Sequence, residues 1–514
     1  MQRSFLLHQL LERAAYAAPN NLALVDRKDA WDYATLREHA RRVACALTRG
    51  GVQKGDRVAL FMEKSGWAVA AVYGILMTGS AYVPLDISAP ASRNALILSR
   101  ASVRTLITTA SKAGDVVELG HTGNVLALDP ATGPAEAGDG EHAAPAITDT
   151  SIAYILHTSG STGVPKGVAI SHRNSLCFID AAMDAFAFTA EDRFALHAPL
   201  HFDLSVFDLY CAASCHGAVV VVPEFFSAFP KKMSALITEQ RISVWNSVVS
   251  ALALLLDKGR AGELDMSGVR SIFFSGERMP IPLLRRIRET FTHARLYNVY
   301  GQTEANSSMA HEVVEVPAAS DAVLPLGRTL PNFEVFLVGD DGKVLAGAGT
   351  GELCVRSGSV ASGGYFQDPE RTSEKFTADP LFPETGSRIY RTGDLARRTE
   401  AGMLELVGRR DNMVKSRGYR IELAEVERAI EEVPGVVELA IVAVPDEQIG
   451  NAILAFVTVT SGDAASIQSA IAKKLPPYMI PSPISVEEAL PRTSSGKIDK
   501  QALTKKAGAL RAKS

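Results

Sequence analysis

Hydrophobic residues recur with alternating helical and strand patterns along the first hundred positions. From Thr35 to Gly50 the apolar positions follow a helical period, whereas Val58 to Phe61 is a continuous apolar run. A second helical stretch extends from Trp67 to Met77 and precedes the short apolar run from Ala81 to Leu85. This alternation of helices and buried strands predicts a layered α/β structure.

Two changes of pattern divide the rest of the chain. The segment from Asp129 to Thr150 is rich in Ala, Gly, Pro and Asp without apolar periodicity, so we expect an exposed loop. Near the C-terminus, the charged stretch from Arg409 to Asp411 precedes short strands and a helix over residues 414–459. The sequence therefore predicts a large multi-subdomain N-terminal α/β domain, residues 1–410, and a small α+β C-terminal domain, residues 411–514.

Composition and charge narrow the classes of function. With 514 residues, 47% hydrophobic and 21% charged, the chain is typical of globular proteins and long enough for several units. A formal net charge of −4 gives no general attraction to nucleic acid or to an anionic membrane. Five scattered cysteines favour reduced thiols, and the apolar run near the N-terminus is too short for a signal peptide or a membrane span. We expect a cytoplasmic protein with no nucleic-acid or membrane partner.

A polar loop between two predicted strands is the clearest candidate for chemistry. The apolar run from Tyr154 to His157 leads directly into Thr158, Ser159, Gly160, Ser161, Thr162, Gly163, Val164, Pro165, Lys166 and Gly167. The glycines let the backbone curve around an anion, and the hydroxyls, N–H groups and lysine supply donors and positive charge. Proline before the lysine and a strand after it distinguish the loop from a Walker A sequence. By itself the loop fits a polar turn as well as a phosphate site.

The loop and several other ordered motifs resemble the adenylate-forming superfamily, which includes acyl- and aryl-CoA synthetases and luciferase, and in particular the adenylation domains of nonribosomal peptide synthetases. The other matching segments are residues 81–86, 298–304, 390–394, 408–411, 414–422 and 491–499. The resemblance covers nearly the whole chain. It implies an AMP-forming ligase that uses ATP and Mg²⁺ to activate a carboxylate, with a C-terminal domain that moves between two steps.

The resemblance also assigns nucleotide-binding roles to individual residues. Adenylation depends on alignment of the reactants and neutralisation of phosphate charge. Glu304 is expected to bind Mg²⁺, which prefers carboxylate oxygens, and Lys497 to bridge the substrate carboxylate and the α-phosphate. The expected catalytic residues are Lys497, Lys166, Thr303 and Glu304. The expected nucleotide contacts are Thr158, Ser159, Gly160, Ser161, Thr162, Gly163, Lys166, Ser275, Gly276, Glu277, Asn298, Tyr300, Gly301, Thr303, Asp394, Arg409 and Lys497. Taken singly, these fit ordinary roles, such as a solvated acid, a core tyrosine or a turn-capping aspartate.

The segment from His201 to Asp208 resembles the start of the substrate pocket in amino-acid-selective members. Asp203 is expected to pair with the substrate ammonium, because a buried cation without a partner is costly; the alternative is an aspartate that satisfies loop amides. The expected pocket residues are Asp203, Leu204, Phe207, Asn246, Phe273, Ser275, Val299, Ser307 and Ser308. Two phenylalanines and no further charge favour a small neutral amino acid. Alanine is the first candidate, and serine, threonine, glycine, proline and a β-amino acid stay possible.

The resemblance further implies a second step. Asp411 matches the hinge of the family, and Gly418 is expected to let a phosphopantetheine arm approach after the small domain turns. No carrier attachment motif follows Lys497. We therefore expect the acceptor thiol on a separate acyl or peptidyl carrier protein, as in nonribosomal peptide and antibiotic biosynthesis or D-alanine incorporation into cell walls. The alternatives are an acyl- or aryl-CoA synthetase, a kinase or ATPase that forms ADP, and a non-catalytic nucleotide-binding protein.

Overall fold

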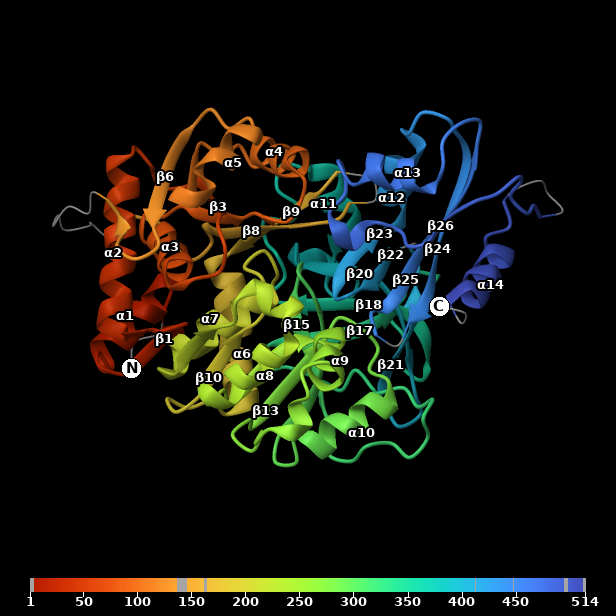
Figure 1. The fold of residues 1–514 in the computed structure, drawn as a ribbon. Helices are drawn as coiled ribbons and strands as arrows, with labels where there is room; N and C mark the ends of the chain where they lie inside the picture. The colour runs from red at the N-terminus through yellow and green to blue at the C-terminus, as the bar shows by residue number, and fades with distance from the viewer. Residues whose placement is uncertain are drawn as a thin grey trace.

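The computed structural model describes residues 4–135, 146–160, 164–411, 413–446, 448–493 and 498–511. A large N-terminal domain carries a smaller C-terminal domain against one side (Figure 1). Helices and sheets alternate in layers, which confirms the predicted mixed α/β class. Within the described ranges, no helix has the length and apolar character needed to cross a membrane.

The first sheet of the large domain has seven strands in the order β7-β6-β5-β3-β4-β8-β9. Its strands are β3 (Arg57–Phe61), β4 (Ala81–Pro84), β5 (Thr105–Thr109), β6 (Asn124–Asp129), β7 (Gly133–Pro134), β8 (Ile152–Thr158) and β9 (Lys166–Ser171). One face is covered by α4 (Ala91–Arg100) and α5 (Ala113–Glu118), which follows the short helix η1 (Ala110–Lys112). The antiparallel pair β8–β9 carries the polar loop at its turn.

The second sheet has nine strands in the order β16-β15-β14-β13-β12-β10-β11-β1-β2. They are β1 (Leu22–Asp26), β2 (Asp29–Asp32), β10 (Arg193–Leu196), β11 (Ala218–Val221), β12 (Val244–Val248), β13 (Ser271–Ser275), β14 (Arg295–Gln302), β15 (Asn306–Glu312) and β16 (Arg328–Thr329). Its outer face is covered by α8 (Pro230–Glu239), α9 (Val249–Asp257) and α10 (Ile281–Thr290), with the short helices η2 (Glu224–Ala228) and η3 (Ala261–Glu263).

A layer of helices lies between the two sheets and forms the main core. It contains α1 (His8–Ala17), α2 (Tyr33–Arg49), α3 (Gly66–Met77), α6 (His172–Phe186) and α7 (Leu204–Cys215). Every residue of α3 is buried, as expected for a helix that is apolar on all sides. The predicted helix from Thr35 begins two residues earlier, because the side chain of Asp32 accepts the Thr35 N–H and caps it.

A third sheet joins the large domain to the small one. Its strands are β17 (Phe333–Val338), β18 (Gly349–Ser357), β19 (Phe376–Ala378), β20 (Arg388–Arg398) and β21 (Leu404–Arg409), accompanied by α11 (Pro369–Lys375) and η4 (Pro383–Thr385). The predicted domain boundary at Asp411 falls between β21 and the next strand.

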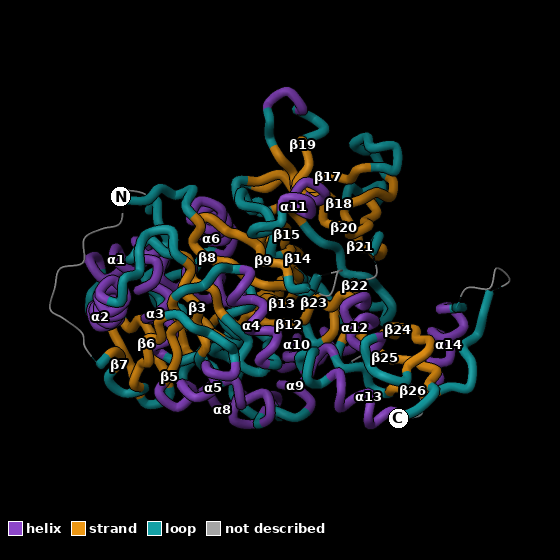
Figure 2. The backbone as a smooth tube through the Cα atoms, turned by 90° about the horizontal axis from the view of Figure 1, so that it is seen from above, coloured by secondary structure: helices purple, strands orange, loops and turns teal. Residues whose placement is uncertain are grey.

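The small domain contains a hairpin and a three-stranded sheet. Its elements are β22 (Met413–Ser416), β23 (Tyr419–Glu422), α12 (Leu423–Glu431), β24 (Val436–Asp446), β25 (Gly450–Val459), α13 (Ala464–Ile471), η5 (Pro477–Met479), β26 (Ile484–Val486) and α14 (Lys500–Arg511). Side chains of α12 and α13 pack in one apolar cluster and α14 in another, so the helices cover opposite faces of the sheet. In Figure 2, α14 lies on the side farthest from the large domain.

Candidate active site

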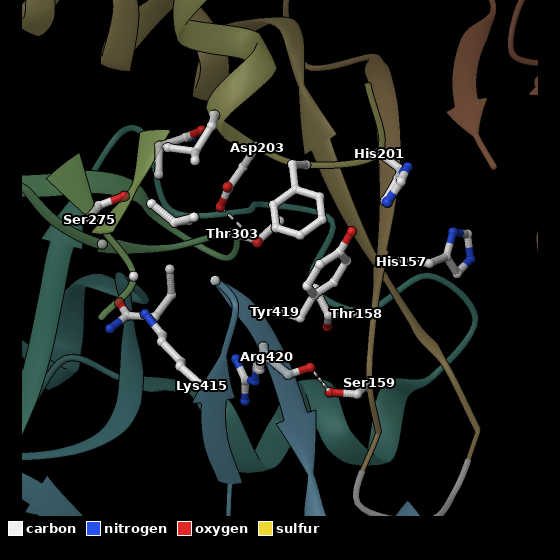
Figure 3. Close-up of a pocket in the computed structure, with 18 of the residues that line it drawn as sticks. His157, Thr158, Ser159, His201, Asp203, Ser275, Thr303, Lys415, Tyr419 and Arg420 are labelled. Atoms are coloured by element: carbon white, nitrogen blue, oxygen red, sulfur yellow. Dashed lines mark hydrogen bonds between the residues drawn. The ribbon is translucent and has the colours of Figure 1, made fainter. Parts of the chain in front are cut away.

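A cavity of about 150 Å³ lies where strands of the large domain meet the β22–β23 hairpin (Figure 3). The carboxyl ends of the parallel strands β12, β13 and β14 reach the same edge of their sheet and supply one wall. The end of β8 supplies another, and Lys415, Tyr419 and Arg420 of the hairpin face them. Clefts at the carboxyl ends of parallel strands are common binding sites in α/β proteins.

The polar loop brings Lys166 to a buried position beside this cavity. Thr158 and Lys166 pair across the β8–β9 turn. The Lys166 Nζ donates to Glu304 Oε1 and to the Tyr365 hydroxyl, both at 3.1 Å. Burial and the nearby Arg420 lower the pKa of Lys166 to about 8, although the Glu304 carboxylate opposes the shift. Four predicted contacts lie outside the described residues: Ser161, Thr162, Gly163 and Lys497.

Glu304 is fully buried at the centre of a small charged cluster. Its Oε1 accepts from Lys166, from the Tyr365 hydroxyl at 2.7 Å and from Arg420 at 3.3 Å. Burial raises the pKa of Glu304, but Lys166 and Arg420 outweigh it and hold the pKa below its usual value. The second oxygen, Oε2, has no hydrogen-bond partner within the described part of the chain. A buried anionic oxygen without a partner fits a divalent cation, and Mg²⁺ typically takes one or two carboxylates together with substrate phosphates.

Asp394 lies in a second polar cluster with the predicted residues Tyr300 and Arg409. The Tyr300 hydroxyl donates to Asp394 Oδ2 at 2.6 Å, and Gln302 Nε2 donates to the same oxygen at 2.7 Å. Arg409 binds Asp394 Oδ1 and also forms two hydrogen bonds with Asp411, at 2.6 and 2.7 Å. The guanidinium therefore ties β20 to the residue at the predicted hinge.

Asp203 lies at the start of α7, with its carboxylate in the cavity (Figure 3). The Thr303 hydroxyl donates to Asp203 Oδ2 at 2.8 Å. Burial raises the pKa of Asp203, while Thr303 and the Lys415 ammonium oppose the rise. The N–H of Leu204 also hydrogen-bonds to this carboxylate. A buried carboxylate that faces a cavity is suited to pair with a ligand cation.

The predicted substrate residues line this cavity, with one exception. Leu204, Phe207, Asn246, Phe273, Ser275, Val299 and Ser307 surround it together with Asp203. Phe207 and Phe273 pack against one another with ring centroids 5.0 Å apart, and Phe186 from α6 closes the same end. Ser308 does not line the cavity, because its buried hydroxyl donates to the Tyr300 carbonyl at 3.5 Å.

Asn298 and Glu277, which are predicted nucleotide contacts, do not line the cavity and direct their side chains to other partners. The Asn298 amide donates to the Pro325 carbonyl at 2.9 Å. The Glu277 carboxylate accepts the N–H groups of Ser250 and Gly418. In contrast, Thr158, Ser159, Ser275, Gly276, Gly301 and Thr303 line the cavity.

Residues 11–366 match the family described as AMP-binding enzyme, and residues 425–497 match the AMP-binding enzyme C-terminal domain. The chain belongs to the AMP-binding enzyme family. It is 35% identical over 510 residues to an L-proline–[L-prolyl-carrier protein] ligase of Pseudomonas fluorescens Pf-5, over 97% of this chain and 99% of that protein. It is also 34% identical to surfactin synthase subunit 3 of Bacillus subtilis, covering 96% of this chain but 38% of that subunit.

Solved structures agree with this assignment. The amide bond synthetase McbA from Marinactinospora thermotolerans superposes with a TM-score of 0.87 at 26% identity, over 97% of this chain and 99% of that one. PA1221, a nonribosomal peptide synthetase protein with adenylation and carrier domains, gives 0.83 at 26% identity, over 97% and 84%. This AMP-binding enzyme is an AMP-forming ligase, which excludes the kinase and the non-catalytic alternatives.

The structure adds residues that the sequence did not single out for this AMP-binding enzyme. Arg420 and Lys415 lie in the segment 414–422, which matches the family. Nothing in that segment indicated that Arg420 binds Glu304 or that Lys415 lies close enough to Asp203 to affect its pKa. Tyr365 belongs to none of the matching motifs. It lies in the chain between β18 and β19, which places its hydroxyl against Glu304. Gln302 is the neighbour of Thr303 and donates to the buried Asp394.

Proposed function

We propose that this enzyme activates a small neutral amino acid as its aminoacyl-adenylate, with alanine as the first candidate, and passes it to the phosphopantetheine thiol of a separate carrier protein. The observation that carries this proposal is the Asp203 carboxylate, which faces a cavity with aromatic walls. An acyl or aryl acid offers no cation for this anion, so a CoA synthetase acting on such acids is the weaker reading.

The polar groups of the cavity could also bind the hydroxyl group of a substrate side chain. Asn246 Nδ2 lies 3.4 Å from both the Leu204 carbonyl and Asp208 Oδ1, which are acceptors, so its amide orientation is defined. The amide oxygen is then the group left for a ligand. Alanine fits the aromatic walls, and serine or threonine would in addition donate a hydroxyl hydrogen to Asn246.

The residues around the cavity suit the nucleotide chemistry. Lys166 and the donors of the polar loop would bind the phosphates, and the ring of Tyr300 would pack against adenine. Asp394, held by Arg409, would accept hydrogen bonds from the ribose hydroxyls. Glu304 would hold Mg²⁺ through its free oxygen, and a bound Mg²⁺ would neutralise negative charge on the phosphates. The ammonium of Lys497 would contact both the substrate carboxylate and the α-phosphate and would stabilise negative charge on them.

The observed arrangement of the small domain suits the transfer step. We call it the hairpin-in orientation, because the turn at Gly418 lies in the cavity wall. A second cavity, of about 770 Å³, adjoins the first and shares Asp86, Phe202 and Tyr419 with it. A pantetheine arm would reach the adenylate through this space. Adenylation would use another orientation, reached by a turn at Asp411. The similarity to a carrier-protein ligase supports the carrier as acceptor.

A panel of amino acids in ATP–pyrophosphate exchange tests the proposed function. We expect exchange with alanine, serine or another small neutral amino acid, and none with acidic or basic ones. The cations Lys415 and Arg420 belong to the hairpin, which would leave the cavity for adenylation, and Asp203 would then be the one charged residue of the proposed substrate pocket. Propanoate and benzoate serve as controls without an amino group. Preference for either of these acids would contradict the proposal and favour a CoA synthetase.

Gly418→Ala should impair transfer more than adenylation. Gly418 has φ +77°, and a Cβ built there would lie 2.2 Å from Val248 Cγ1. The clash costs roughly 1–3 kcal/mol in the hairpin-in orientation, so transfer to the carrier should fall about thirtyfold, whereas the strain of the left-handed turn is present in both orientations. Exchange should change much less, because the proposed adenylation orientation removes the hairpin from this contact. Equal losses in the two assays would contradict this expectation.

A further inference from the structure

Glu277 belongs to the large domain, but its carboxylate is bound to the small one. It follows β13, where Oε2 accepts the Ser250 N–H at 2.8 Å. Its Oε1 accepts the N–H of Gly418, across 141 positions of the chain, at 2.6 Å. A third segment also approaches it, since a Cβ at Gly450 would lie 3.0 Å from Oε1. The carboxylate therefore joins the cavity edge to two turns of the small domain.

The chemistry of this contact makes it specific to one orientation. The Gly418 N–H lies at the turn of the hairpin, where Arg417 and Gly418 both have positive φ, and it donates to Glu277. Hydrogen bonds from N–H groups to a carboxylate are about twice as strong as those between neutral groups. When the hairpin leaves the cavity, Glu277 keeps Ser250 and loses Gly418.

We propose that Glu277 is a positioning residue that holds the small domain in the hairpin-in orientation and thereby favours aminoacyl transfer over adenylation. The assignment of this orientation to transfer rests on the proposed function, whereas the bond between the domains does not. A buried ion pair between Arg93 of α4 and Glu425 of α12 also joins the two domains. Loss of Glu277 should therefore shift the balance of orientations without abolishing the contact.

Glu277→Gln tests the effect on the two half-reactions. Glutamine keeps the shape but has one acceptor oxygen, so it can satisfy only one of the two N–H groups. The loss of one hydrogen bond to a charged group corresponds to about a tenfold lower rate of transfer to the carrier. Exchange should stay within about threefold of the wild-type rate or rise, because the balance moves toward the adenylation orientation. Glu277→Asp, which keeps the charge but cannot reach both partners, should show the same bias. A higher KM for ATP with equal losses in both assays would instead make Glu277 a nucleotide contact and overturn the proposal.

A cross-link measures the orientation without any substrate. The Ser92 hydroxyl donates to the Lys473 carbonyl at 3.3 Å across the two domains. In a protein carrying Ser92→Cys and Lys473→Cys, a short bis-maleimide should join the pair, and adding Glu277→Gln should lower the yield several-fold. Glu263→Gln removes a carboxylate that pairs with Arg260 in the large domain, so this matched control should leave the yield unchanged.

The two kinds of failure are separable. If the pair cross-links equally well with and without Glu277→Gln, the proposed positioning role is wrong. If no amino acid supports exchange but the cross-link still depends on Glu277, the proposed function fails while the role of Glu277 in the orientation stands.

Discussion

Lys497→Ala is expected to lower amino-acid-dependent pyrophosphate exchange by about a thousandfold and to change ATP binding little. The proposed role of this lysine is to contact both the carboxylate and the α-phosphate in the transition state. Its neighbour Ile498 packs with the cluster that α14 covers, on the sheet face opposite α12. Under the proposed function, a turn at Asp411 would bring this face of the small domain to the cavity for adenylation, so the loss should be confined to the adenylation step.

Exchange and transfer measured separately provide the control. Transfer from chemically supplied aminoacyl-adenylate should proceed at nearly the wild-type rate in Lys497→Ala. Lys500→Ala is a matched variant, because Lys500 is an exposed lysine of the same segment that pairs with Glu427. It should retain exchange. Wild-type exchange in Lys497→Ala would show that another group supplies the positive charge.

Periodicity predicted the layers of the fold well because local burial decides them. Every residue of α3 is buried, and the continuous apolar runs became β3 and β4 in the interior of a sheet. The small domain likewise follows its apolar pattern in α12 and β25. The start of α2 differs from the predicted start because the Asp32 side chain caps the helix there.

The site was harder to predict where it depends on the direction of a side chain or on contact between distant parts of the chain. Ser307 and Ser308 are neighbours on β15, and successive side chains of a strand point to opposite faces, so only Ser307 reaches the cavity. The bond between Glu277 and Gly418 depends on how two domains meet, which no local pattern contains. Arg420 reaches Glu304 for the same reason.

Asp203→Asn should lower kcat/KM for the amino acid in exchange by two to three orders of magnitude. A charged ligand left unpaired in a buried site costs about 3–5 kcal/mol, and asparagine keeps the size of aspartate without its charge. Thr303 can still donate to the asparagine amide oxygen, so we expect the fold to persist. The loss should fall on the amino acid, whereas the KM for ATP should stay close to that of the wild type.

Comparison with an acid that lacks the amino group isolates the charge. Wild-type enzyme should strongly prefer alanine to propanoate, and Asp203→Asn should lose most of this preference, because propanoate never uses the carboxylate. The pH dependence gives a second criterion. Burial raises the pKa of Asp203, so the wild-type KM for alanine should increase as the pH falls through this raised pKa and the carboxylate becomes neutral. The asparagine variant has no such group and should lack this increase. An unchanged preference for alanine in Asp203→Asn would mean that the ammonium is recognised elsewhere in the cavity.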